Sequence, residues 1–133
     1  MAGIFDRTIG LLERGLGLAW FRHTLLASNL ANAETPGFQP RDISFTKELE
    51  RAMEGVEMSL MRTHPHHLPP RGMSPNPEVV LRGGWGNPDG NKVDLEEEAV
   101  RLAENYLKYM ALLRALEEKF SLLKYTIAEG GGP

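Results

Sequence analysis

The chain has 133 residues, with 15 Lys and Arg, 18 Asp and Glu and no Cys, which gives a formal net charge of −3. This length fits one domain, and the charge balance disfavours a general nucleic-acid binder, which needs a basic excess to neutralise phosphates. The absence of Cys excludes disulfides, thiol nucleophiles and Cys-ligated zinc, and no apolar run reaches the roughly 18 residues of a membrane span. Asp6, Arg7 and Glu13 also interrupt the apolar run of a cleavable signal peptide, so none is expected.

Residues 1–33 form the first predicted unit, an N-terminal helix. Its main apolar seam alternates spacings of four and three, the heptad pattern of a coiled coil. The seam contains Phe5, Ile9, Leu12, Leu16, Ala19, His23, Leu26, Leu30 and Ala33. A second apolar line repeats every seven residues, at Ile4, Leu11, Leu18 and Leu25. A helix that is apolar on more than one face must be buried on more than one face, so a single partner helix cannot cover both lines.

A helix stop is predicted at the end of this unit. The stretch reads Asn29-Leu30-Ala31-Asn32, then Ala33-Glu34, then Thr35-Pro36-Gly37-Phe38. Pro36 disfavours helical geometry at the preceding residue, and Pro-Gly suits the two central positions of a type II turn. Asn29 and Asn32 lie three residues apart on one helical face. Their amides can bond a neighbouring helix or cap the last free carbonyls.

Residues 34–93 form an irregular central segment that holds eight of the nine Pro. We expect a short helix over Phe45–Glu54, capped by Asp42 or Ser44 and ended by Gly55, with material for a short strand over Glu78–Arg82.

Three histidines in the centre, His64, His66 and His67, are the candidate metal ligands. Their spacing matches no known metallohydrolase and no Cys assists, so no native metal site is expected. No Ser–His–Asp constellation or phosphate-binding loop can be identified either. The sequence therefore predicts a protein without catalytic, metal or cofactor-binding residues.

Residues 94–133 form the third unit, a long C-terminal helix followed by a Gly-rich tail. Asp94 is the predicted N-cap, with Glu97 in the capping-box position, and Glu96, Glu97 and Glu98 are interpreted as a solvated first turn favoured by the helix dipole. The apolar seam contains Leu95, Ala99, Leu102, Tyr106, Tyr109, Leu113, Leu116, Phe120, Leu123 and Ile127. A partial second line follows Val100, Ala103, Leu107 and Met110.

The predicted fold is mainly α, with the two long terminal helices pairing as an antiparallel, coiled-coil-like hairpin around the irregular Gly/Pro-rich centre. The packing seam is expected to bring together residues of both helices: Leu12, Leu16, Leu26 and Leu30 with Leu102, Tyr106, Tyr109, Leu113, Leu116 and Phe120. The second apolar lines are then left for other copies or other proteins, as in an assembly subunit. Two alternatives remain: a globular domain whose centre covers these lines, and an amphipathic-helix adaptor, which would lack the usual Lys/Arg stripe.

The helix stop resembles the signature of the axial proteins of the bacterial flagellum, the rod, hook and hook-associated proteins. The matching residues are Asn29, Leu30, Ala31, Asn32, Thr35, Pro36, Gly37 and Phe38. The resemblance is strongest to the proximal-rod members of this family, because of Arg22, the run Arg41–Phe45 and the run Gly90–Glu98. The nearest alternative is another axial rod protein, of the FlgC type.

The resemblance implies a structural subunit of the basal-body rod that crosses the periplasm. Such subunits are exported by the flagellar type III system without signal cleavage, and they assemble into the axial tube by helix packing. The implied partners are copies of the chain, other rod proteins, the FliE adaptor and the type III export gate. No nucleic acid, cofactor or membrane span is implied.

Overall fold

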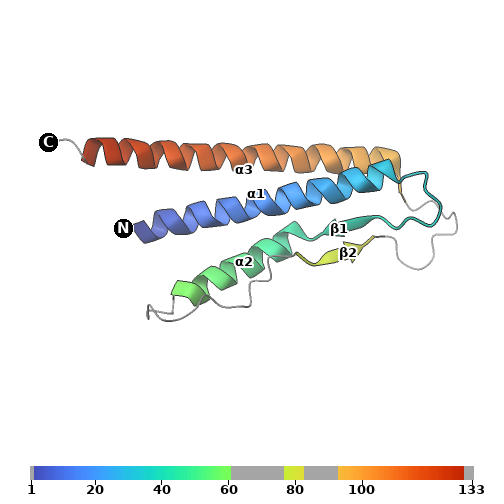
Figure 1. The fold of residues 1–133 in the computed structure, drawn as a ribbon, viewed down its shortest axis with the longest axis horizontal. Helices are drawn as coiled ribbons and strands as arrows, with labels where there is room; N and C mark the ends of the chain where they lie inside the picture. Colours follow the sequence, from blue (N-terminus) through green and yellow to red (C-terminus); the bar gives the residue numbers. More distant parts are fainter. Residues whose placement is uncertain (1, 61–76, 83–92, 131–133) are drawn as a thin grey trace.

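The computed structural model describes residues 2–60, 77–82 and 93–130. Five elements follow one another along the chain: α1 (Ala2–Ala31), β1 (Arg41–Ile43), α2 (Phe45–Leu60), β2 (Val79–Leu81) and α3 (Leu95–Gly130). Helices α1 and α3 lie side by side and antiparallel, with the start of α1 and the end of α3 at the same end of the molecule (Figure 1). The predicted mainly helical fold with a hairpin of long terminal helices is confirmed.

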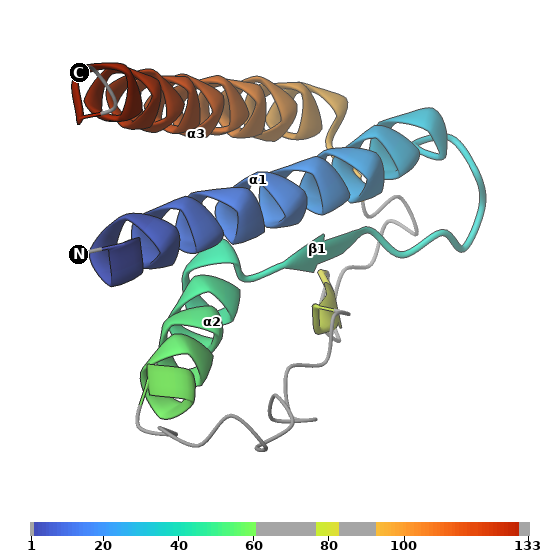
Figure 2. The same ribbon diagram turned by 60° about the vertical axis from the view of Figure 1, so that its left-hand side comes forward.

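Helix α1 is the central element of the fold. It contacts α3 on one side and α2 and β1 on the other (Figure 2). Ala19 and Leu26 are both 0% exposed, and Leu18, from the predicted second line, is also buried. The two apolar lines of α1 are therefore explained within the chain, because the centre of the chain covers one side of α1 and α3 covers the other.

Helix α3, by contrast, is covered on one side only. Its buried residues are Glu98, Asn105 and Leu116. Four residues of the predicted seam, at positions 102, 109, 113 and 123, are half-buried. Tyr106 and Phe120 of that seam are 53% and 47% exposed. The face of α3 that contacts α1 is thus rotated about the helix axis relative to the predicted seam. It contains Asn105, a polar residue that is not part of the apolar pattern.

The short central helix is longer than predicted. The expected end at Gly55 is wrong, since α2 continues to Leu60. A glycine inside a helix costs only about 1 kcal/mol relative to Ala, and it ends a helix only where it adopts a left-handed conformation. Ser44 rather than Asp42 occupies the position before the helix, and its carbonyl accepts the first helical hydrogen bond, from the Glu48 amide at 3.0 Å.

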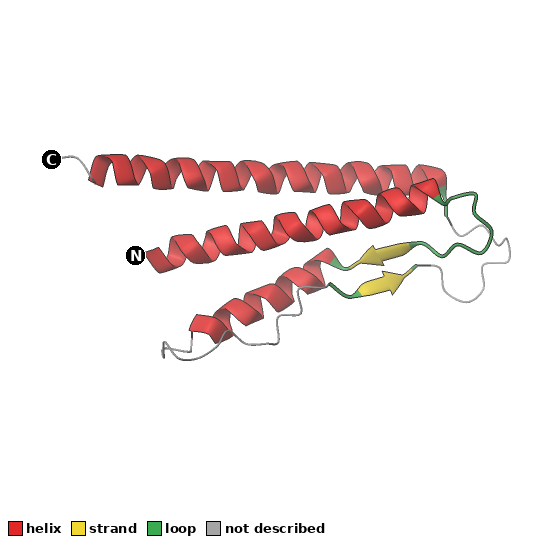
Figure 3. Cartoon of the chain, in the orientation of Figure 1, coloured by secondary structure: helices red, strands yellow, loops and turns green. Residues whose placement is uncertain are grey.

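A two-stranded antiparallel sheet lies beside α2, on the side of α1 opposite α3 (Figure 3). The register pairs Arg41 with Leu81, Asp42 with Val80 and Ile43 with Val79. Strand β2 lies inside the predicted strand, whereas β1 has no counterpart in the sequence prediction. Three residues of Arg-Asp-Ile are too few to show an alternating pattern, and the strand exists because its partner strand and α1 hold it.

Leu26→Ala is expected to lower the free energy of unfolding by roughly 2–5 kcal/mol, because it opens a cavity at a fully buried position of α1. Leu107→Ala is the matched control: the same change at a residue that is 67% exposed should stay within about 0.5 kcal/mol. Urea unfolding followed by helical circular dichroism measures both. Equal losses would show that Leu26 does not belong to the core.

Candidate functional site

Five polar residues meet where α1, the sheet and α3 come together. They are Arg22 and Asn29 of α1, Asp42 of β1, Arg82 directly after β2, and Glu98 of α3, and we call them the polar junction. Asn29, Asp42 and Glu98 are buried. The junction therefore joins segments from both ends and from the centre of the chain.

Asp42 is the acceptor at the middle of the junction. Arg22 donates to it with two nitrogens, Nε to Oδ1 at 2.8 Å and Nη2 to Oδ2 at 3.1 Å. The Ile43 amide also donates to Oδ1, at 2.8 Å. A bidentate guanidinium–carboxylate pair is directional as well as strong, so it fixes the position of β1 along α1.

Arg82 connects Asp42 to Glu98. Its Nε lies 3.5 Å from Asp42 Oδ2, and its Nη1 lies 2.6 Å from Glu98 Oε1. Its backbone amide donates to the Pro40 carbonyl at 2.7 Å, which holds the residue after β2 against the residue before β1. Because two guanidiniums face two buried carboxylates, each buried charge in the junction has a partner, as burial of charge requires.

The interpretation of Glu98 as part of a solvated first turn is wrong. Its side chain is 3% exposed and is paired with Arg82. Asp94 does cap α3 as predicted, since its Oδ1 accepts from the amides of Glu96 at 3.0 Å and Glu97 at 3.3 Å. Glu97 extends outward to Arg101. That hydrogen bond is the main reason that the pKa of Arg101 is raised, in spite of partial burial.

The charges of the junction set the ionisation of Asp42. Burial acts to raise the pKa of this carboxyl. The hydrogen bonds from Arg22 and Ile43, together with the charges of Arg22 and Arg82, outweigh burial and hold the pKa below its ordinary value of 3.8. The ionised carboxylate therefore stabilises the folded chain.

Asn29, the first residue of the predicted assembly motif, lies inside the junction. Its Nδ2 donates to the Arg41 carbonyl at 2.7 Å, and its Oδ1 accepts from the Arg41 amide at 2.9 Å. The same Nδ2 lies 3.4 Å from Glu98 Oε2. Asn29 thus supplies both backbone hydrogen bonds of one strand residue, in the way that another strand would.

The rest of the motif forms the helix stop and the turn. Asn32 Nδ2 donates to the Ser28 carbonyl at 2.8 Å, and the Asn32 backbone amide donates to the same carbonyl at 3.0 Å, so Asn32 binds the last turn of α1 twice. The Phe38 amide donates to the Thr35 carbonyl at 3.2 Å, and Gly37 has a φ of 76°, the left-handed value that the predicted type II turn needs. Leu30 and Phe38 are half-buried, whereas Ala31 and residues 35–37 are exposed.

A second polar link, between α1 and α3, was also absent from the sequence prediction. Asn105 is 0% exposed, and its Nδ2 donates to the Ala19 carbonyl at 2.8 Å. Arg82, Glu98 and Asn105 are polar residues of these two links that sequence reasoning missed. The only local signal for them is a polar residue on or beside an apolar line, and it does not identify the partner.

The described residues contain no candidate metal cluster of three or more His, Cys, Asp or Glu. The candidate ligands His64, His66 and His67, for which no metal site is expected, lie outside the described residues, as does the glycine-containing run 83–92. Within residues 2–60, 77–82 and 93–130, no helix combines the length and the apolarity that crossing a bilayer requires.

Comparison with known proteins shows similarity to flagellar rod proteins over nearly the whole chain. The chain is 34% identical to the flagellar basal body rod protein FlgB of Yersinia ruckeri over 132 residues, covering 94% of this chain and 96% of the relative. It is 36% identical to FlgB of Salmonella typhimurium over 118 residues (84% and 86%). It is 30% identical to FlgB of Bacillus subtilis over 129 residues (96% and 98%). No protein-family model matches the chain.

Asn29→Leu is expected to destabilise the isolated chain by about 1–3 kcal/mol, because it removes both partners of the Arg41 backbone at a fully buried side chain. Asn32→Leu is the control with the same change of side chain. Its bond to Ser28 lies at a half-buried helix end, where water can replace it, so the loss should be smaller. Urea unfolding measures both, and equal losses would count against the role given to Asn29.

Acid should weaken the fold through Asp42. Since the pKa of Asp42 is lower in the folded chain than in the unfolded chain, its stabilising effect is complete above the unfolded value and is lost as the pH falls through the folded value. Asp42→Asn should therefore be less stable than the parent at pH 7 and lose less stability between about pH 5 and pH 2. Urea midpoints across this range test the prediction, and an equally steep acid dependence in the variant would contradict it.

Proposed function

The chain belongs to the family of the flagellar basal body rod protein FlgB, and on this premise we propose how it serves as a structural subunit of the rod. Its place is the proximal rod, and its mechanism is the packing of α1 and α3 against helices of neighbouring subunits. The rod that it helps to build crosses the periplasm.

The observation that carries this mechanism is the uncovered apolar face of α3. Val100 is 56% exposed, Leu107 is 67% exposed and Met110 is 42% exposed. These residues belong to one line along the side of α3 that faces away from α1. A row of large exposed apolar side chains marks a surface that another protein covers. In a rod subunit, a neighbouring subunit supplies that cover.

The partners in this proposal are copies of the chain, other rod proteins, the FliE adaptor and the export gate of the flagellar type III system. Export proceeds without cleavage of a signal peptide. Support comes from the resemblance of the helix-stop motif to the axial proteins and from the match to FlgB proteins over most of the chain. The role is structural rather than enzymatic, which agrees with the names of these relatives.

The alternatives weighed from the sequence receive less support. An axial protein of the FlgC type would share the helix-stop motif, but the relatives cited above are all FlgB proteins. An amphipathic-helix adaptor would need a Lys/Arg stripe along the polar face of its helix, and the sequence of α1 lacks one.

The exposed residues Thr35, Pro36 and Gly37 of the turn are the part of the assembly motif that a neighbour can touch. Asn29 holds β1 beneath it, and Asn32 holds the last turn of α1. The turn therefore leaves α1 in a fixed direction, and in the rod it presents Thr35, Pro36 and Gly37 to the next subunit.

Gly37→Val and Asn32→Leu are each expected to block rod growth while leaving export largely intact. Valine is strained at a φ of 76°, and leucine cannot donate to the Ser28 carbonyl. Swimming of cells that carry each variant reports rod growth, and the amount of chain outside the cytoplasm reports export. Glu34→Gln, an exposed neighbour of the turn, is the control and should swim normally. Normal swimming by both test variants would reject the role of the turn.

A further inference from the structure

The two-stranded sheet has one closed edge and one open edge. At the outer edge of β1, the Asn29 side chain occupies both backbone groups of Arg41. Strand β2 lies on the other side of β1 from α1 (Figure 3). Its residues Val79, Val80 and Leu81 are 40%, 43% and 63% exposed. Within the described part of the chain no third strand pairs with β2, so its outer edge is the open one.

The contacts of Asn29 determine which residue of β1 bonds β2. In an antiparallel pair, successive residues of a strand direct their N–H and C=O groups to opposite sides. Both backbone groups of Arg41 are bonded to Asn29 and therefore point away from β2. The next residue, Asp42, then exchanges hydrogen bonds with Val80, its partner in the register.

The same alternation along β2 leaves Val79 and Leu81 open. The Arg82 amide donates to the Pro40 carbonyl, so the backbone groups of Val80 and Arg82 point toward β1 and the residue before it. The N–H and C=O groups of Val79 and Leu81 point the other way, to the outer edge, where no described residue bonds them. Such a row of unpaired backbone groups is a template for another strand.

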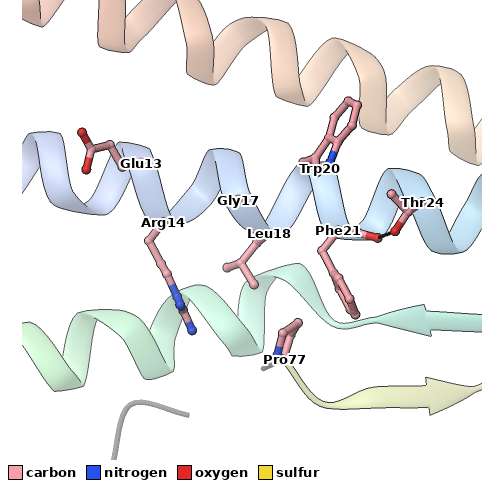
Figure 4. Close-up of a pocket in the computed structure, with 8 residues that line it drawn as sticks. All are labelled: Glu13, Arg14, Gly17, Leu18, Trp20, Phe21, Thr24 and Pro77. Atoms are coloured by element: carbon pink, nitrogen blue, oxygen red, sulfur yellow. Dashed lines mark hydrogen bonds between the residues drawn. The ribbon is translucent and has the colours of Figure 1, made fainter. Parts of the chain in front are cut away.

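Strand β2 is fixed at both of its ends. The Glu78 amide donates to Oε1 of Glu48 at 3.0 Å, and this carboxylate side chain is 3% exposed. Pro77 lines one pocket with Phe21, and Figure 4 shows Phe21 of α1 extending toward Pro77, where β2 begins. At the other end, Arg82 belongs to the polar junction. A strand that is already ordered loses little conformational freedom when a further strand joins it.

The length of β2 limits how its edge can be used. A strand of three residues buries far less than the roughly 1,000 Å² that a stable interface needs. The edge therefore cannot hold a free partner from solution. It can pair with a segment that is already close, because a neighbour bound through other contacts raises the effective concentration of that segment.

Symmetry excludes this sheet itself as the source of the new strand. In a rod whose copies share one orientation, contacts between copies join two different surfaces. The edge of β2 then cannot meet the same edge of another copy, and the outer edge of β1 is closed by Asn29. The new strand must come from a segment outside this sheet.

We propose that the edge of β2 accepts an extended segment of a neighbouring rod subunit as a third strand of the sheet. This inference rests on the proposed rod function, which supplies the neighbour. The segment spans at least three residues and carries no proline where its N–H must donate. Because the side chains of β2 are apolar and exposed, the segment that fits them is rich in β-branched or aromatic residues.

Hydrogen exchange of three successive amides tests the proposal on the parent chain. The amides of Val79, Val80 and Leu81 are compared in the free chain and in basal bodies that carry the chain in place of the native rod protein. In the free chain, Val79 and Leu81 should exchange faster than Val80, whose amide faces β1. In basal bodies, Val79 and Leu81 should slow by about tenfold or more. Val80 is the internal control, since β1 protects it in both states.

Three results would overturn the inference and leave the rod function standing. Fast exchange of Val79 and Leu81 in basal bodies would show that no strand pairs with β2. Slow exchange in the dilute free chain would show that the chain covers this edge itself. Slowing that appears in the free chain as its concentration rises would show pairing with a second copy in solution. Failure of the parent chain to enter basal bodies would instead reject the proposed function.

Two substitutions at one position separate the backbone from the side chain. Leu81→Pro removes an outward N–H and leaves the N–H groups that face β1 in place, whereas Leu81→Thr keeps the N–H and changes the side chain. Leu81→Pro should reduce swimming more than Leu81→Thr, while the urea midpoints of both stay close to that of the parent. Equal swimming by the two variants would contradict pairing through the backbone. Because the exchange experiment uses the parent chain, its result does not depend on how these variants fold.

Discussion

The pairing of two buried carboxylates with guanidiniums is the constraint on which the rest of this structure depends. Asp42 and Glu98 are both below 10% exposed, and Arg82 lies between them. Because an unpaired charge cannot be buried cheaply, β1, the end of β2 and the start of α3 are held at one place beside α1. The Asn29 amide then bonds the strand and contacts Glu98. Polar groups rather than apolar area thus determine how the two chain ends align.

This alignment divides the apolar surface unequally. Helix α1 packs against α3 on one side and against α2 and β1 on the other, whereas the outward side of α3 carries large exposed apolar side chains. Apolar packing gives little directional preference by itself. The polar junction therefore selects one orientation of α3, in which one particular apolar face of α3 remains exposed. A rod subunit gains from such rigidity, because the same face must be presented in every copy.

Sequence reasoning predicted the features whose signals are local. The heptad spacing indicated both long helices, Asp94 marked the start of α3, and Pro36-Gly37 marked the turn. It missed features that depend on distant pairs. Asn29 and Glu98 are 69 residues apart in sequence, and Asn105 and Ala19 are 86 apart. Periodicity could not show that α3 turns Asn105 rather than Tyr106 toward α1, because a buried polar residue is explained only by its partner. The helix-stop motif was recognisable, but the division between a buried Asn29 and an exposed turn was not.

A double-mutant cycle between Arg82 and Glu98 tests this account most directly. The single variants Arg82→Met and Glu98→Gln and their combination are compared with the parent by urea unfolding at pH 7. If the junction holds the chain ends in register, the cycle gives a coupling free energy of about 1–3 kcal/mol. Additive effects, with coupling below about 0.5 kcal/mol, would contradict the account.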